Sequence, residues 1–308
     1  METVITMKEA KDFLEERQTH LYDQVHPASA VNFQSFDEVV IAGHSYQMAR
    51  SAKRLFAQKL QIPIDYLSRC SEHLQEINLN HWVRSLGDGP LFVRFYDEMV
   101  RAVFSLRYRT IDHVDIVSRL IKSFPGEKEV RFSLSDELLL IRLIDSLQKF
   151  NISGIRKDEI SPGIAIVNSE TGWSAFSIEA FFLRLVCTNG LITETAVSNR
   201  TRHIKENALE NFDQLVSMVY LEAGQVREKF YISKDQEAKD PLATFTSFNH
   251  RFGLTKKEGE AVAQAWDGGK TMFSIINAYT GAANSRDLPL EVSYKLQRVG
   301  GMILSLVK

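Results

Sequence analysis

Alternating apolar runs that are paired across short polar steps occupy the middle of this 308-residue chain. Residues 90–96 and 99–108 are rich in β-branched and aromatic side chains, and a two-residue polar step separates them. Such runs favour β-strands, and the short step between them favours a hairpin. Residues 130–134 and 138–144 form a second pair of the same kind. The pattern predicts an antiparallel sheet at the centre of the fold.

The next segment continues the sheet. Residues 162–168 and 173–187 predict two strands joined by a turn at 170–172. Asn189-Gly190 carries the strongest turn signal, because both residues tolerate the positive φ of a type I′ turn, and residues 191–197 would return as a strand. For residues 137–149 a helix is an alternative interpretation, since the apolar residues there also follow helical spacing.

Helical periodicity flanks the predicted sheet on both sides. The first 80 residues are predicted to be mostly helical, with an amphipathic helix over 46–60. An apolar stripe from Ile204 to Ala223 predicts a long helix. Thr255 and Glu258 have the spacing of a capping box. Further helices are predicted over four C-terminal ranges: 242–252, 256–266, 271–283 and 290–306.

These patterns predict an α+β fold, with a central antiparallel sheet flanked by helices and a mostly helical C-terminal part. We divide the chain into an N-terminal helical region (1–80), an α+β core domain (81–235) and a helical C-terminal region (236–308). The second boundary follows the polar stretch 232–241, which ends in an Asp-Pro turn signal.

Composition limits the classes of function. The chain has 37 Lys and Arg against 39 Asp and Glu, a formal net charge of −2, which argues against a uniformly basic nucleic-acid binder but allows a local basic groove. No apolar run approaches the ~18–20 residues of a membrane span, and residues 1–16 contain no apolar signal segment. Two cysteines, Cys70 and Cys187, cannot form a disulfide scaffold. We therefore expect a cytoplasmic protein with no membrane partner.

Motifs for catalysis and cofactors are missing from the sequence. The 8 histidines are dispersed without metal-ligand spacing, and neither a Gly-x-Ser-x-Gly elbow nor a phosphate-binding glycine loop occurs. We expect no metal, no cofactor and no catalytic residue. An enzyme remains an alternative only if two predicted turns converge into one polar pocket. The residues of those turns are Asn168, Ser169, Glu170, Cys187, Thr188 and Asn189.

Arginines interleaved with aromatic residues are the most distinctive local pattern. Arginines beside aromatics on a sheet can follow phosphates while the rings stack on bases. The first hairpin and the residues after it supply Arg94, Arg101, Arg107, Arg109, Tyr96 and Tyr108, and Trp173 is a further stacking candidate. A second basic cluster contains Arg200, Arg202 and Lys205. The pattern predicts a nucleic-acid interface, and its alternative is a set of solvated faces around an aromatic core.

Three stretches resemble a known family. They are LFVRFYDEMVRAVFSLRY (91–108), IVNSETGWSAFSIEAFFLRLVCTNGL (166–191) and the run 266–283, which contains Asn-Ala-Tyr-Thr. Together they are similar to the phage- and plasmid-encoded family known as domain of unknown function 932, over roughly residues 40–306. The resemblance implies a mobile-element context. More distantly, the order of sheet, Arg-bearing hairpin and long helix is similar to that of single-strand annealing proteins, which form rings or filaments around DNA.

The sequence therefore leads to one main hypothesis and one alternative. The main hypothesis is a phage or plasmid protein of the bacterial cytoplasm that binds DNA, preferably single-stranded, as an annealing or replication accessory. Because the local positive surplus is small, we expect it to act as a homo-oligomer. The alternative is a protein-interaction module, such as a counter-defence or regulatory factor, since the charge is near neutral and the C-terminal part is helical and apolar.

Overall fold

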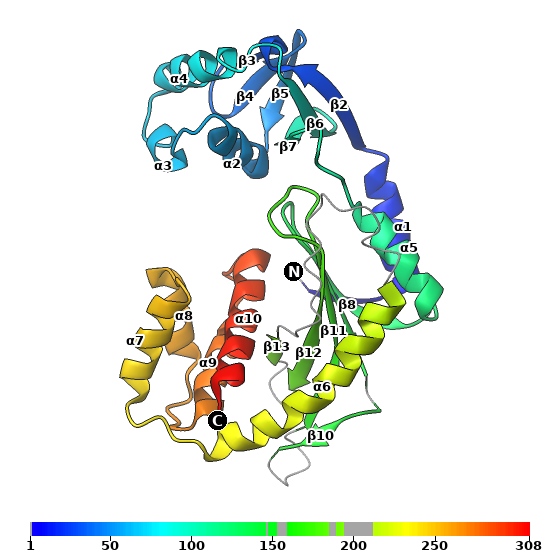
Figure 1. Ribbon diagram of the computed structural model, residues 1–308, viewed down its shortest axis with the longest axis vertical. Helices are drawn as coiled ribbons and strands as arrows, with labels where there is room; N and C mark the ends of the chain where they lie inside the picture. The colour runs from blue at the N-terminus through cyan, green and yellow to red at the C-terminus, as the bar shows by residue number, and fades with distance from the viewer. Residues whose placement is uncertain (1, 146, 153–158, 185–188, 194–211) are drawn as a thin grey trace.

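The computed structural model describes residues 2–145, 147–152, 159–184, 189–193 and 212–308 (Figure 1). Two mainly antiparallel sheets, each with its own helices, confirm the α+β class. One sheet, which we call the N-terminal sheet, is built from strands between residues 21 and 104 and lies at one end of the molecule (Figure 1). The other forms the centre of the molecule, with the C-terminal helices beside it (Figure 1).

The N-terminal sheet contains the predicted Arg-bearing hairpin. Its strand order is β2 (Leu21–Pro27), β6 (Pro90–Tyr96), β7 (Met99–Phe104), β5 (His44–Met48), β4 (Glu38–Ile41) and β3 (Val31–Phe33). The antiparallel pairing of β6 with β7 confirms the hairpin. One face packs on helices α2 (Arg50–Lys59), α3 (Ile64–Leu67) and α4 (Glu72–Arg84), and a short 3-10 turn, η1 (Ala28–Ala30), follows β2.

Strands inside the first 80 residues overturn the mostly helical prediction there. The predicted helix over 46–60 is present only as α2, because residues 44–48 form β5 instead. Edge strand β2 is largely exposed on both faces, so its sequence lacks the alternation of apolar and polar residues that marks a half-buried strand. Its strand conformation depends on hydrogen bonds to β6, which is distant in the sequence.

The central sheet has the order β1 (Thr3–Thr6), β8 (Glu129–Leu134), β9 (Leu139–Ile144), β11 (Glu159–Asn168), β12 (Ser177–Arg184) and β13 (Asn189–Thr193), and β10 (Phe150–Asn151) also pairs with β11. The β8–β9 hairpin confirms the predicted pair and excludes the helix over 137–149. The Asn189-Gly190 turn is wrong, because both residues pair in register with β12. Gly190 is required by packing, since a Cβ there would lie 2.8 Å from Cε2 of Phe181.

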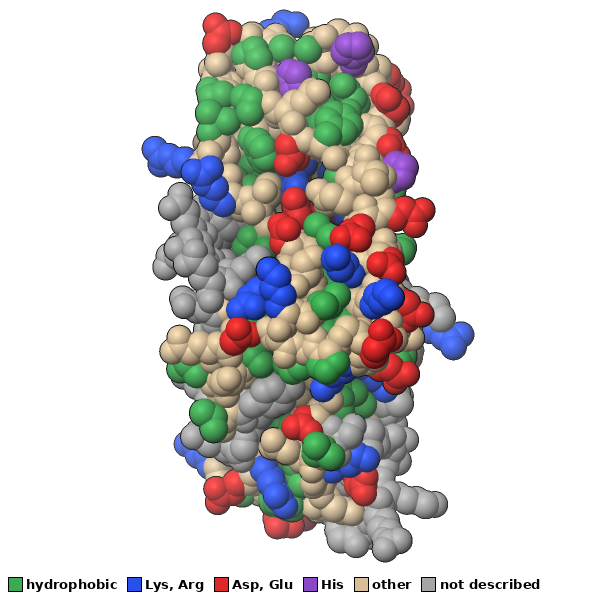
Figure 2. Space-filling model, turned by 90° about the vertical axis from the view of Figure 1, so that its right-hand side faces the viewer, with side chains coloured by type: hydrophobic (Ala, Val, Ile, Leu, Met, Phe, Trp, Pro, Cys, Tyr) green, Lys and Arg blue, Asp and Glu red, His purple; other side chains and the backbone are tan. Residues whose placement is uncertain are grey.

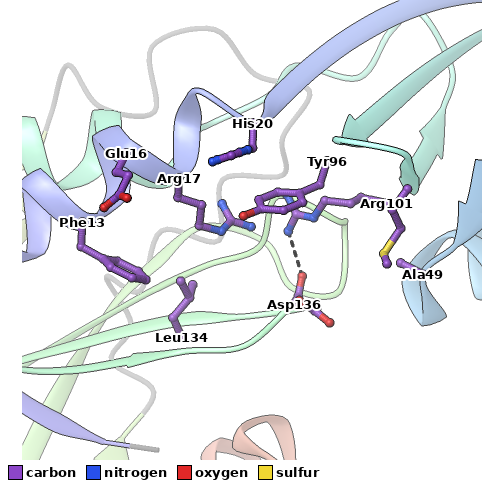
Figure 3. A pocket seen from close by; sticks show the side chains of 10 residues that line it. Phe13, Glu16, Arg17, His20, Ala49, Tyr96, Arg101, Leu134 and Asp136 are labelled. Atoms are coloured by element: carbon purple, nitrogen blue, oxygen red, sulfur yellow. Dashed lines mark hydrogen bonds between the residues drawn. The ribbon is translucent and has the colours of Figure 1, made fainter.

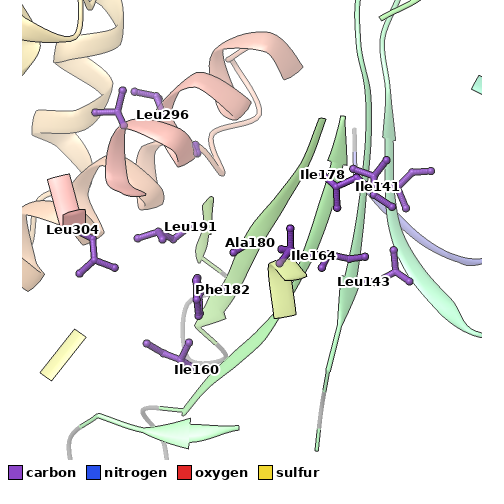
Figure 4. Packing of buried hydrophobic residues seen from close by; sticks show 14 of the residues in the cluster. Ile141, Leu143, Ile160, Ile164, Ile178, Ala180, Phe182, Leu191, Leu296 and Leu304 are labelled. Atoms are coloured by element: carbon purple, nitrogen blue, oxygen red, sulfur yellow. The ribbon is translucent and has the colours of Figure 1, made fainter. Parts of the chain in front are cut away.

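Helices cover the central sheet unequally. On one face lie α1 (Met7–Gln18), α5 (His113–Ser123) and α6 (Phe212–Asp235), and beyond β13 lies a bundle of α7 (Pro241–Arg251), α8 (Lys256–Ala265), α9 (Met272–Ala282) and α10 (Leu290–Leu306) (Figure 1). Figure 4 shows Leu296 and Leu304 of α10 beside Leu191 of β13. Gly301 lets α10 approach this closely, because a Cβ there would lie 2.0 Å from the Ile192 carbonyl oxygen.

The four C-terminal helices confirm the predicted ranges to within a residue or so, and Thr255 and Glu258 form the predicted capping box. Helix α6 confirms the later part of the long helix; residues 194–211 lie outside the described part. The division into three regions stays a prediction, although β6 and β7 pair with β2 and β5 from the first region. No helix among the described residues is both long and apolar enough to cross a membrane.

Candidate functional site

Two arginines of the predicted interface lie between the sheets. Arg94 on β6 and Arg101 on β7 are only 2% and 3% exposed. The Arg94 guanidinium donates to Asp23 (Nε to Oδ1, 2.9 Å) and to Asp112 (Nη2 to Oδ1, 2.6 Å). Arg101 Nη1 donates to Glu170 Oε2 at 3.0 Å. In this structure the partners of these arginines are carboxylates of the same chain.

Glu170 lies at the centre of this contact. It follows β11 in the turn toward β12, and it is 1% exposed. Its carboxylate accepts from Arg17 Nη1 at 2.9 Å, from Arg101, and from the backbone N–H of His113 at 3.0 Å. Burial by itself would raise the pKa of Glu170, but Arg17, Arg101 and the backbone N–H of His113 outweigh it and hold the pKa well below its usual range. Glu170 is therefore charged in the folded protein.

His113, the first residue of α5, is held neutral beside this carboxylate. Asn168 donates from Nδ2 to His113 Nδ1 at 3.0 Å, which leaves the proton on Nε2, 3.7 Å from Glu170 Oε2. Burial lowers the pKa of His113 to about 3, because the attraction of Glu170 does not offset the lost hydration and the nearby arginines. The ring thus packs as an uncharged group.

A fourth arginine and a second glutamate extend the contact. Arg54 of α2 donates from Nη2 to the Thr171 carbonyl oxygen at 3.2 Å and lies 3.4 Å from Glu137 Oε2. Thr171 Oγ1 also donates to Glu137 at 3.0 Å. We call the whole group the ionic hub; its members are Arg17, Arg54, Arg94, Arg101, Asp23, Asp112, Glu137 and Glu170. Its four positive and four negative charges balance. The ion pairs Arg54–Glu137, Arg94–Asp112 and Arg101–Glu170 link the N-terminal sheet and its helices to the central sheet.

A cavity of about 500 Å³ opens beside the hub, and we call it the inter-sheet cavity. Figure 3 shows Arg17, Tyr96 and Arg101 close together in it, with the carboxylates of Glu16 and Asp136 on either side. The Tyr96 ring stacks on His20 with centroids 5.4 Å apart. Because the acidic side chains here offset the arginines, the cavity does not favour a phosphate group.

The remaining predicted residues lie in the loop after β7, in the turn between β11 and β12, and outside the described residues. Arg107 and Arg109 are exposed in the loop after β7, and Tyr108 between them stacks on Phe104 with centroids 3.7 Å apart. Trp173 packs on Tyr294 of α10 at 6.2 Å. The second basic cluster, Arg200, Arg202 and Lys205, lies outside the described residues. The assignment of these side chains to a nucleic-acid interface stays a prediction.

The two turns on which the enzyme alternative depended lie at opposite ends of β12. Asn168 ends β11 near Ser177, whereas Asn189 pairs with Arg184. Strand β12 runs from Ser177 to Arg184, about 23 Å at ~3.3 Å per residue. Cys187 and Thr188 are outside the described residues, but Asn168 and Glu170 are far from Asn189. The proposed polar pocket therefore does not form from these turns.

A second group of basic side chains lies on the central sheet and was not among the predicted site residues. Arg131 of β8 and Arg142 of β9 are directly opposite each other in the hairpin register, on the face away from α1, α5 and α6. With Lys128 and Lys149 they line a hollow of about 670 Å³, which we call the basic hollow. Glu129 and Asp145 are the acidic residues of its lining. The register of the predicted hairpin would have revealed this pairing.

The two faces of the central sheet differ in charge pattern. Figure 2 shows the side that carries α1, α5 and α6, where basic and acidic side chains are interspersed. The basic hollow lies on the other face, where four basic residues meet two acidic residues of the lining. Glu2 pairs with both arginines and Glu159 pairs with Lys149, so the distinctive feature of this face is the opposed pair of arginines and not a net positive charge. Paired arginines of this kind are a common site for phosphate groups.

Comparison with protein families gives one match. Residues 102–288 match the model of a domain of unknown function (DUF932). The matched segment includes Asp112, His113 and Glu170 of the contact between the sheets, and all four basic residues of the basic hollow. No curated protein and no solved structure matches the chain. Since the match covers more than half of the sequence and agrees with the resemblance seen in its motifs, the chain belongs to the DUF932 family.

Proposed function

We propose that this protein binds DNA, preferably single-stranded, through the basic hollow of the central sheet. The observation that carries the proposal is the opposed pair Arg131 and Arg142, with Lys128 and Lys149 beside them. Like charges directly opposite on neighbouring strands destabilise a sheet. Such a pair is stabilised when an anion lies across it, and a DNA backbone supplies phosphates at regular intervals.

A single strand suits the shape and lining of the hollow. Its exposed apolar side chains are Leu147 and Val4, which are 96% and 57% exposed. Unpaired bases can lie on apolar surface while their phosphates meet the arginines, whereas a duplex presents mainly its backbone. The hollow therefore favours a flexible strand over a duplex.

The biological setting that we propose is an annealing or replication accessory of a phage or plasmid, acting in the cytoplasm of a bacterial host. Carboxylates balance the basic side chains around one hollow, so one copy has few phosphate contacts to offer. Several copies along one strand would add these contacts together. We therefore propose a homo-oligomer, which negative-stain images with and without DNA would show as rings or filaments.

Fluorescence anisotropy with a labelled single-stranded oligonucleotide at two salt concentrations tests the proposal. Lys128→Gln with Arg131→Gln should weaken binding about tenfold, since two phosphate contacts are lost. The salt slope, which is the slope of the logarithm of the binding constant against the logarithm of the salt concentration, should become smaller by about 2. The matched control is Lys122→Gln, an exposed lysine on α5 on the other face of the sheet. Absence of binding at low salt, or equal loss in the control, would contradict the proposal.

One observation favours the alternative function, a protein-interaction module. Helices α3 and α4 expose five large apolar side chains on the N-terminal unit: Ile64, Tyr66, Leu74, Ile77 and Trp82. Leu74 and Ile77 are spaced three residues apart and lie on one side of α4. A host partner that is captured after nuclease treatment and is lost on Leu74→Glu with Ile77→Glu would support this function over DNA binding.

A further inference from the structure

The basic hollow already holds a carboxylate of the same chain. Glu2, just before β1, forms an ion pair with Arg131 (Nη1 to Oε1, 2.5 Å) and another with Arg142 through Oε2. The position of Glu2 follows from the sheet, because Val4 of β1 pairs with Arg131 of β8. Its carboxylate thus bridges the two opposed arginines.

This carboxylate leaves donors in the hollow unused. Within the described residues, Arg142 Nε and the Ser161 hydroxyl are buried without a hydrogen-bond partner. Arg142 is 5% exposed and Ser161 is fully buried, and both line the hollow. An unpartnered buried donor costs about 1–3 kcal/mol, so two of them in one hollow indicate a ligand with more acceptor oxygens than Glu2 provides.

We propose that Glu2 is an internal stand-in for a phosphate group, and that Arg131, Arg142 and Ser161 form a phosphate subsite. A carboxylate has two oxygens, and both already contact arginines. A phosphate has additional oxygens that can accept from Arg142 Nε and the Ser161 hydroxyl. The planar guanidinium of arginine can also donate two parallel hydrogen bonds to a phosphate. The inference rests on the proposed function only in naming DNA as one source of the phosphate.

The stand-in makes Glu2 a competitor of the ligand. When Glu2 occupies the subsite most of the time, the apparent affinity for phosphate is reduced in proportion to the fraction of molecules in which the subsite is free. Removing the charge at Glu2 should therefore tighten phosphate binding, whereas an essential structural carboxylate would have no such effect. Removing Arg131 should weaken phosphate binding, since one of the two arginines of the subsite is lost.

Isothermal titration of the full chain with inorganic phosphate tests this directly. Glu2→Gln should bind inorganic phosphate at least about fivefold more tightly than the unaltered protein. Glu2→Gln with Arg131→Gln should lose that gain, and Glu2→Gln with Lys122→Gln, which removes an equal charge on the other face, should keep it. Acetate should bind Glu2→Gln at least about fivefold more weakly than phosphate, because it leaves the same donors unused.

Three results would overturn the inference: no gain in Glu2→Gln, no loss on adding Arg131→Gln, or equal affinity for acetate and phosphate. Thermal melts of each variant establish that the fold is kept. The source of the phosphate is then read from labelled single-stranded DNA. A gain for both phosphate and DNA in Glu2→Gln assigns the subsite to a strand, and a gain for phosphate alone supports the subsite while contradicting DNA binding.

Discussion

Arg101 of the ionic hub and Arg142 of the basic hollow are both buried arginines in the interior of a strand, yet they have different surroundings. Arg101 donates to the buried Glu170 and to the Asp136 carbonyl oxygen, and further carboxylates are nearby. Arg142 contacts only the partly exposed Glu2 among the described carboxylates, and its guanidinium lies over the Phe181 ring, with Cζ 5.5 Å from the ring centroid. The position of nearby carboxylates, and not burial, therefore separates a structural arginine from one that is available for a ligand.

The largest expected effect is loss of the arginine in the hub. Arg101→Met should lower the free energy of unfolding by about 3–5 kcal/mol, because it removes one charge from a buried, hydrogen-bonded group and leaves Glu170 less compensated. Urea denaturation measures it. A loss below about 1 kcal/mol would show that the hub does not hold the sheets together.

The hub should also make stability depend on pH. His113 is neutral when folded, with a pKa lowered by burial to about 3, so below its unfolded pKa near 6.5 the unfolded chain binds a proton that the folded chain refuses. Stability should therefore fall by up to about 1.4 kcal/mol per pH unit, roughly 2 kcal/mol between pH 6.5 and 5. Glu170, whose pKa is lowered, contributes stability above about pH 4.5 that is lost at still lower pH.

Denaturation midpoints over this pH range give the measurement, and His113→Gln is the control. The variant should show a flatter profile above pH 5, because glutamine keeps a polar side chain without titrating. An unchanged slope in His113→Gln would assign the pH dependence to other groups.

The matched substitution in the basic hollow should have a smaller effect. Arg142→Met should change the free energy of unfolding by no more than about 1 kcal/mol, since an apolar side chain of similar length replaces a poorly compensated charge and Glu2 keeps its ion pair with Arg131. Burial lowers the pKa of Arg142 to about 10, which reflects the same lack of compensation. Equal losses of unfolding free energy for Arg101→Met and Arg142→Met would contradict the difference between the two arginines.

The smallest effect on stability is expected at the exposed loop after β7. Arg107→Ala with Arg109→Ala should leave the unfolding free energy within about 0.5 kcal/mol. If the loop contacts DNA as its sequence predicts, the salt slope of binding should fall by about 1–2. An unchanged slope, measured by anisotropy, would confine the interface to the basic hollow.

Much of the fold could be predicted from local pattern. The hairpins β6–β7 and β8–β9 and the C-terminal helices carry strong alternation or helical periodicity, because each buries one face. Strands β2 and β5 were not predicted because they are largely exposed, so they carry no alternation of apolar and polar residues. The Asn189-Gly190 signal misled, since the small glycine is needed against Phe181 and not for a turn.

The surroundings of the predicted arginines could not be read from the sequence. Arg94 and Arg101 were predicted to contact nucleic acid, and in the structure both form ion pairs in the ionic hub. Their partners Asp23, Asp112 and Glu170 come from three other segments, so their neutralisation could not be seen locally. The resemblance found the Asn-Ser-Glu segment as a motif, and the structure shows it buried between the sheets.

The sequence alone determined the α+β class, the family and the presence of strand-borne arginines, because these follow from periodicity and motifs over short distances. Which of these arginines are neutralised depends on the folded arrangement of the chain. Electrostatic energy depends on the distance between charges and on burial, and both are set by the packing of segments far apart in the chain. Glu170 neutralises Arg101 across the inter-sheet contact, whereas Arg131 and Arg142 share the carboxylate of Glu2.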